Sequence, residues 1–273
     1  MKMAFLLSYL DWLKDTGVAL STKDGAPVKV FELLHSDDNS ILSEWAKHFR
    51  NQYCSDSEID FLRESTGKSR TEYLDDLKFP TEKDGFGPGT RSGDFAEILV
   101  SDYLEYVSNY WVPRTRYDRK TIRNESTKGS DILAFKIISS TDSPNDCLAM
   151  YEVKAKLSGR KTNARLQEAI NHSGKDNLRK AESLNAIRQR LFDVKNIQDA
   201  QKIGRFQNPA DRPYKDLYGA VALYESKIYD PLEASVSDTS VHPNKGSLSL
   251  IIIKSKDFMS LVNSLYKRAA DEA

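Results

Sequence analysis

Two carboxylates and a lysine stand on segments that otherwise predict buried strands. Asp131 opens one apolar run, and Glu152 and Lys154 lie within the next one. Side chains at positions i and i+2 of a strand share a face, so Glu152 and Lys154 should point the same way, with Val153 on the opposite, core-facing side. An antiparallel hairpin of the two strands would bring Asp131 beside Glu152. The spacing therefore predicts two carboxylates and an ammonium group at one place.

This set of groups suits a hard cation and a phosphate. Mg²⁺ prefers one or two carboxylates, with water and substrate oxygens completing its shell. Asp131 and Glu152 supply that number, and the backbone carbonyl of Val153 can add a ligand. A divalent ion lowers the pKa of bound water, and an ammonium group stabilises charge that develops on a phosphate. The chemistry predicted from these residues is phosphodiester hydrolysis.

Other interpretations of the same residues stay open from the sequence. Glu152 and Lys154 would also fit a charge pattern on an exposed sheet face, and Asp131 a turn after Gly129. No GxSxG motif occurs, and neither Cys54 nor Cys147 has an obvious base partner, which disfavours a protein nucleophile. The histidines are isolated and are interpreted as structural or surface residues: His35, His48, His172 and His242.

Hydrophobic periodicity predicts the elements that carry these residues. A helix is expected over 94–110 and a long helical stretch over 163–192 with a break at 173–174. Strands are expected over 28–34, 114–123, 131–138, 148–156, 217–224 and 248–253, and a last helix over 256–270. Residues 80–93 read as a loop because they hold several glycines and prolines, and 225–247 as a long polar loop. The order predicts a mixed α/β fold with helices on both faces of a sheet.

Composition and charge narrow the class. The chain has 273 residues, of which 39% are hydrophobic and 29% charged, as is typical of a soluble globular protein. No run approaches the roughly 18 apolar residues that span a bilayer, so no membrane contact is expected. Two thiols without an export signal indicate a reducing, cytoplasmic setting. The net charge is zero, but residues 1–89 carry about five excess negative charges and basic residues crowd around the two strands.

The motif residues resemble the PD-(D/E)XK nuclease superfamily over roughly residues 90–225. The resemblance implies an α/β, restriction-endonuclease-like core of helix, three-stranded meander, helix and strand, here with an extra C-terminal strand and helix. It implies Mg²⁺- or Mn²⁺-dependent DNA cleavage, with Asp131 and Glu152 as metal ligands and Lys154 beside the attacking water. Glu97 matches an acidic position on the first core helix and is thereby a further catalytic and metal-ligand candidate, and Gln167 is the nearest candidate for a polar position after the lysine. The superfamily's proline is here Ser130.

A narrower resemblance covers most of the chain. The segments at 93–99, 129–133 and 151–156, with an acidic, mostly helical N-terminal part, are similar to the nuclease subunit of the Hachiman anti-phage defence system. That resemblance implies DNA as substrate and a superfamily 2 helicase subunit as partner. The partner would supply ATP binding, because this chain has no Walker motif. It suggests an N-terminal interaction domain over 1–89 and a nuclease domain over 90–273.

Two rival hypotheses remain open from the sequence. The first is a restriction- or repair-type nuclease that acts alone. The second is a nuclease-like fold that has lost catalysis and serves as a DNA-binding or scaffold subunit. The presence of Asp131, Glu152 and Lys154 together argues against the second.

Overall fold

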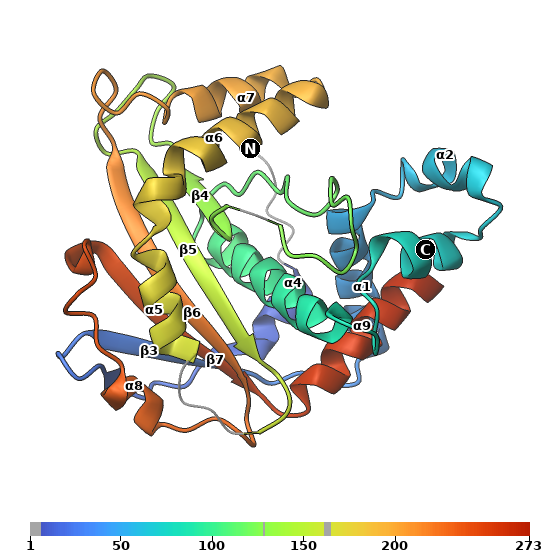
Figure 1. Cartoon of the computed structure of the whole chain (residues 1–273), viewed down its shortest axis with the longest axis horizontal. Helices are drawn as coiled ribbons and strands as arrows, with labels where there is room; N and C mark the ends of the chain where they lie inside the picture. Colours follow the sequence, from blue (N-terminus) through green and yellow to red (C-terminus); the bar gives the residue numbers. More distant parts are fainter. Residues whose placement is uncertain (1–6, 128, 161–164) are drawn as a thin grey trace.

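The strands form one mixed sheet whose centre is parallel. The computed structural model describes residues 7–127, 129–160 and 165–273. Within them the strand order is β1-β3-β7-β6-β5-β4, with β2 also pairing with β3 (Figure 1). β3, β7, β6 and β5 run parallel, whereas β4 is antiparallel to β5, and β1 and β2 are antiparallel to β3. The strands are β1 Leu13–Asp15, β2 Leu20–Ser21, β3 Pro27–Leu33, β4 Ile132–Lys136, β5 Cys147–Lys156, β6 Lys215–Glu225 and β7 Leu248–Ser255.

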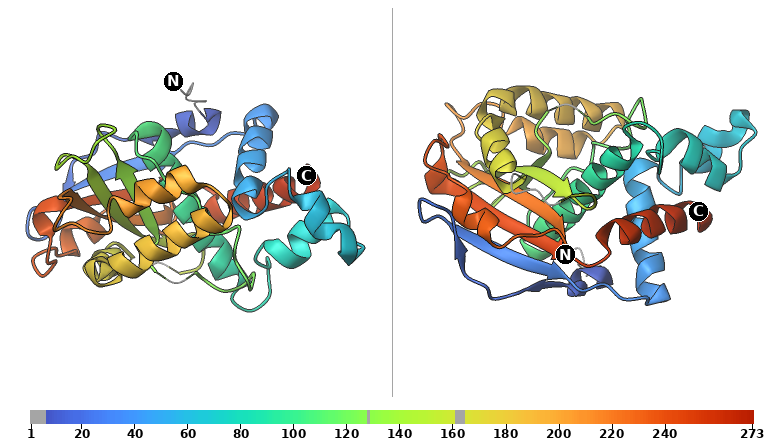
Figure 2. Two further views of the ribbon diagram at one scale, coloured as in Figure 1. Left: turned by 90° about the horizontal axis from the view of Figure 1, so that it is seen from above. Right: turned by 60° about the horizontal axis from the view of Figure 1, so that its bottom comes forward.

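Helices cover both faces of this sheet (Figure 2). One face packs against α1 Asn39–Tyr53, α4 Gly87–Asp102 and α9 Phe258–Asp271. The other packs against α5 Arg165–Ser173, α6 Asp176–Asp193, α7 Ile197–Gly204 and α8 Leu232–Val236. Two short helices, α2 Ile59–Arg63 and α3 Arg70–Tyr73, lie near the end of α9 (Figure 1). Both faces are apolar because the central strands are buried on both sides, as parallel strands are. The predicted mixed α/β class with two covered faces is confirmed.

Sequence signals set several boundaries. Asp38 caps α1, because its side chain accepts hydrogen bonds from the backbone N–H groups of Ser40 and Ile41. α4 begins at Gly87, inside the segment predicted as a loop, since a proline is tolerated in the first helical turn. The segment 225–247 is not wholly a loop, because it contains α8. The break in the helical stretch at 173–174 is confirmed by the end of α5 and the start of α6; residues 163–164 lie outside the described part.

The strand predicted over 114–123 is wrong. That segment is irregular, and only Trp111, before it, makes an isolated antiparallel bridge with Phe135 of β4. Its arginine, tyrosine and lysine side chains bond to α4 instead of alternating across a sheet, as described below. The predicted meander therefore has two strands, β4 and β5, in the described residues. The helix–hairpin–helix–strand order that remains is compatible with a restriction-endonuclease-like core.

The N-terminal part contributes to the same sheet. β3 pairs with β7 in register from Val28 opposite Leu250 to Glu32 opposite Lys254. The boundary predicted between residues 89 and 90 falls inside α4, and α1 shares its apolar core with α4 and α9. Residues 7–89 are thus built into the sheet and core that carry the rest of the chain.

Two features bear on the setting of the protein. Within the described ranges, no helix combines the length and apolar character needed to cross a membrane. Cys54 and Cys147 are both free thiols.

Gly219 of β6 leaves room for the ring of Tyr151 on the neighbouring strand β5. It pairs with Tyr151, and a Cβ atom at Gly219 would lie 2.2 Å from the tyrosine ring. We expect Gly219→Ala to destabilise the fold by about 1–3 kcal/mol, because the buried ring cannot shift freely. Gly93→Ala is the matched control: its Cβ meets nothing within 4 Å, so it should stabilise α4 by roughly 0.5–1 kcal/mol. Urea unfolding of both variants tests the pair, and equal effects would contradict the argument.

Candidate active site

The β4–β5 hairpin brings Asp131 to Glu152. Ile132 pairs with Tyr151 and Leu133 with Met150, so the same antiparallel register places Asp131 opposite Glu152. Asp131 Oδ2 accepts a hydrogen bond of 3.0 Å from the backbone N–H of Val153. The predicted antiparallel pairing of these segments is confirmed.

Glu152 is a buried carboxylate with one unpaired oxygen. Glu152 is 2% exposed and lies on the sheet face that α5 and α6 cover. Oε1 accepts a hydrogen bond from Lys154 Nζ at 2.5 Å and lies 3.2 Å from Nδ1 of His172 on α5. Oε2 is buried without a hydrogen-bond partner in the described residues. The interpretation as an exposed charge pattern is therefore wrong, and Val153 packs in the core of the opposite face as predicted.

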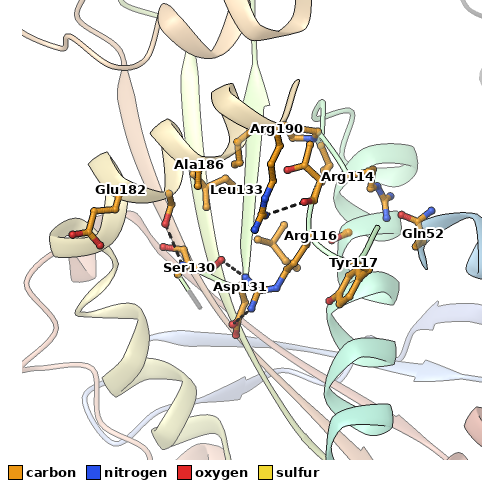
Figure 3. Close-up of a pocket in the computed structure, with 18 residues that line it drawn as sticks. Gln52, Arg114, Arg116, Tyr117, Ser130, Asp131, Leu133, Glu182, Ala186 and Arg190 are labelled. Atoms are coloured by element: carbon orange, nitrogen blue, oxygen red, sulfur yellow. Dashed lines mark hydrogen bonds and ion pairs between the residues drawn. The ribbon is translucent and has the colours of Figure 1, made fainter. Parts of the chain in front are cut away.

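Arg116 joins Asp131 to Glu97. Its Nε lies 2.8 Å from Glu97 Oε2, and its Nη2 lies 3.2 Å from Asp131 Oδ1. Its Nη1 donates to the carbonyl of Ser130 at 2.6 Å (Figure 3). The guanidinium group thus links α4 to the start of β4, and Glu97 reaches the site through it. Tyr117 OH also donates to Glu97, at 2.6 Å.

The connection before β4 is held on α4 by further ion pairs. We call residues 112–127 the strap; it runs beside α4 (Figure 1). Arg114 pairs with the buried carboxylate of Asp102 at 2.7 Å, and Lys120 pairs with Asp94 at 2.5 Å. Arg114 adopts a left-handed φ of 52°, which costs a non-glycine residue roughly 1–2 kcal/mol and needs such contacts to persist. These bonds explain why the strap is not a strand.

Burial and like charges perturb the titration of the site. Burial, together with Glu152, raises the pKa of Asp131, although Arg116 and Lys154 oppose the shift. Burial raises the pKa of Glu97 to about 8 against the effect of Arg116. Burial alone would lower the pKa of Lys154, but Asp131 and Glu152 raise it above its usual value, so the ammonium form persists.

Asp176 adds a fourth carboxyl group to this region. It is the first residue of α6, it is fully buried, and both of its oxygens are without a hydrogen-bond partner in the described residues. Burial raises its pKa to about 7; a contact with Ser130 opposes this, and the charges of Glu152 and Asp131 add to it. Burial is the main cause of the raised pKa, because it disfavours the charged form of the carboxyl group.

The sequence predicted some of these residues and missed others. Asp131, Glu152 and Lys154 are brought together, and Glu97 joins them through Arg116. Gln167 is not part of the site: its side chain bonds to the backbone N–H and carbonyl of Asp238. The missed residues are His172, Arg116 and Asp176. No local sequence pattern identifies them as site residues. Each lies in a helix or loop, and only the tertiary fold decides that its side chain points toward the site.

A model of the HamA family matches residues 8–269, nearly the whole chain. The chain belongs to the HamA family. HamA is a component of the Hachiman anti-phage defence system, so the narrower resemblance noted in the sequence is confirmed. No curated protein matches the sequence.

The donor set of this HamA chain fits a hard cation held mainly by substrate and water. Among the described residues, no group of three His, Cys, Asp or Glu side chains is close enough to bind an ion. Two carboxylates remain, and Mg²⁺ characteristically takes one or two. Glu152 Oε2 is available as a ligand. Because the Val153 N–H bonds to Asp131, its carbonyl points to the same edge of β5 and completes the set.

Asp176 makes stability fall as the pH rises. Its folded pKa of about 7 lies above the unfolded value of about 3.9, so the folded state binds more protons between these values. The stability that the protonated Asp176 contributes is fully present below about pH 4 and is lost as the pH rises through about 7. The free energy of unfolding changes by at most about 1.4 kcal/mol per pH unit in this range. Asp176→Asn removes the charge, so its stability relative to the wild type should rise from pH 5 to pH 8 in urea unfolding with EDTA.

Asp257→Asn is the control for this measurement. Lys227 lowers the pKa of the exposed Asp257, so this carboxylate is ionised throughout the range. The difference in the free energy of unfolding between this variant and the wild type should not change from pH 5 to pH 8. A flat difference for Asp176→Asn as well would refute the assignment of a raised pKa to Asp176.

Proposed function

We propose that this HamA protein is a metal-dependent deoxyribonuclease and the effector of a Hachiman complex that includes a helicase subunit. The observation that carries the proposal is Glu152: a buried carboxylate with one free oxygen, beside Asp131 and paired with Lys154. A buried carboxylate oxygen without a hydrogen bond is costly, and proteins retain one mainly where a ligand uses it. The same burial argues against a scaffold that has lost its catalytic function.

Each residue has a role in this proposal. Asp131, Glu152 and the Val153 carbonyl would hold Mg²⁺ or Mn²⁺. Such an ion lowers the pKa of bound water and neutralises charge on the phosphate. Lys154 keeps its proton and places positive charge where negative charge develops on the phosphoryl oxygens. His172 and Lys154 both contact Glu152 Oε1, which leaves Oε2 turned to other partners.

Glu97 acts through Arg116 in this arrangement. Its carboxylate pairs with Arg116 Nε, and Arg116 contacts Asp131. Glu97 therefore fixes the orientation of Asp131, and it would ligate the ion directly only if Arg116 moved away.

Basic residues beside the site support DNA as the substrate. Lys156 lies two residues beyond Lys154 on β5, and Arg160 is exposed after the strand. Lys175 and Arg179 lie around the start of α6, next to Asp176. Positive side chains at this spacing can contact successive phosphates of a strand. They flank carboxylates that alone would repel DNA.

Family membership and charge support a helicase partner. HamA belongs to a multi-component defence system, and residues 1–89 carry the excess of negative charge. A negative surface disfavours DNA and suits a protein contact.

Cleavage should depend on Glu152 and Lys154. We expect the wild type to nick or cut plasmid DNA with Mg²⁺ or Mn²⁺ and to lose this with EDTA. Glu152→Gln and Lys154→Met should each lower the rate by about 100-fold or more, the order expected for loss of an electrostatic group at a reacting phosphate. The measurement is gel quantification of plasmid forms, alone and with the helicase subunit.

A second lysine–glutamate pair provides the control. Lys254 and Glu32 pair at 2.8 Å on neighbouring strands β7 and β3 of the same sheet, away from the candidate site. Glu32→Gln and Lys254→Met should leave cleavage within about twofold of the wild type, since they remove only a partly exposed ion pair. Equal losses from both pairs, or full cleavage by Glu152→Gln, would disprove the assigned site.

The helicase subunit should stay bound to a variant that cannot cleave DNA. When co-expressed with the helicase subunit of its defence system, the affinity-tagged chain should co-purify it, and Glu152→Gln should do so equally well because that residue is buried. Size-exclusion chromatography with mass determination checks this. A chain that elutes alone and cuts DNA at an unchanged rate with or without the helicase would instead favour the stand-alone nuclease.

A further inference from the structure

A cavity of about 210 Å³ lies next to Asp131, between the strap, the start of β4 and α6 (Figure 3). Its apolar walls come from all three elements: Val112, Pro113, Ile132, Leu133, Ala186 and Ile187. Asp131 belongs both to this wall and to the candidate active site. A ligand held in the cavity would therefore lie directly beside the carboxylates.

Polar groups without protein partners line the same cavity. Ser130 is 4% exposed, and its Oγ has no hydrogen-bond partner in the described residues. Arg114 bonds to Asp102 and Glu105 through Nε and Nη2, while its Nη1 is buried without a partner there. Buried groups of this kind normally bond to something. They would supply a donor and a hydroxyl to a ligand between the apolar walls.

Charge and size restrict the ligand class. Arg114, Arg116 and Arg190 line the cavity together with Asp131 and Glu182. Arg114 and Arg116 are paired with carboxylates, whereas Arg190 donates to the carbonyl of Thr115 and offers a guanidinium group at the wall. The volume is below the roughly 300–1,000 Å³ typical of drug-sized ligands, and suits one small ring system. Apolar faces with hydrogen-bonding groups at the edge are how proteins hold an unstacked base, with arginine planes as an alternative stacking surface.

We propose that this cavity binds a single unstacked nucleobase, supplied by a DNA strand or by a free nucleotide. A base seated between Leu133 and Ala186 places its phosphate on the Asp131 side. For a DNA strand, the inference rests on the proposed nuclease function and gives it a substrate class: DNA that is single-stranded or open at the cleaved nucleotide. An intact, stacked duplex cannot present a base to this cavity without unpairing it.

The test uses single-stranded DNA that contains 2-aminopurine, whose fluorescence changes when the base leaves a stack. Full-length protein in EDTA, which prevents cleavage, should change the signal. Ala186→Phe fills the cavity and should weaken this response by about tenfold, the order lost with one base contact. Ala181→Phe is the matched control: Ala181 is exposed on the same helix, does not line the cavity, and should bind as the wild type does.

A second arm separates the two sources. If free nucleotide is the ligand, dAMP should raise the melting temperature of the wild type and of Ala181→Phe but not of Ala186→Phe, while the DNA response is unaffected. If the melting curve of Ala186→Phe is abnormal, Ala186→Leu, which adds less bulk, replaces it. A response to DNA and to dAMP that is equal in the Ala186 and Ala181 variants would overturn the proposal. These experiments measure binding and not cleavage. If they overturn the base-binding proposal while Glu152→Gln still loses cleavage as expected, the nuclease proposal stands.

Discussion

The bonds of Arg116 hold together parts of the molecule that the backbone alone would leave separate. One guanidinium group contacts Glu97 on α4, Asp131 before β4 and the carbonyl of Ser130. Charge-assisted contacts from one rigid guanidinium group to several partners fix geometry as well as energy. Without them the strap would be held on α4 by fewer bonds, such as those of Arg114, Tyr117 and Lys120, and both the orientation of Asp131 and the wall of the neighbouring cavity would change. The candidate site is thus assembled from long-range ion pairs added to a β-hairpin.

The hairpin itself could be predicted from the sequence. β4 and β5 are continuous apolar runs, and the alternation of side chains assigns Glu152 and Lys154 to one face and Val153 to the other. β6, β7 and α9 follow from the same signals. The parallel pairing of β3 with β7 could not be deduced, because it joins segments more than 200 residues apart. No residue pattern in either strand indicates which other strand lies beside it. The boundary expected at residue 89 falls inside α4.

The rest of the site depends on tertiary context. The segment 114–123 has the tyrosine and threonine content of a strand, yet its arginine, lysine and tyrosine side chains find carboxylates on α4, and those ion pairs override the local preference. His172 reads as an isolated surface histidine until α5 is placed over β5. Asp176 looks like an ordinary residue at a helix start, where a carboxylate is favourable. Only its complete burial distinguishes it.

The charges of the site bear on how a metal ion and a phosphate would bind together. Four carboxyl groups, those of Glu97, Asp131, Glu152 and Asp176, are gathered around two permanent cations, Arg116 and Lys154. Burial raises the pKa values of Glu97, Asp131 and Asp176, which shows how strongly the surroundings disfavour further negative charge. A phosphodiester brings one more negative charge, which these carboxylates oppose. Two positive charges from a divalent ion would offset that repulsion. The carboxylates and the basic segments are therefore complementary: the first would bind the ion, the second would hold DNA, and the ion would strengthen that hold at the reacting phosphate.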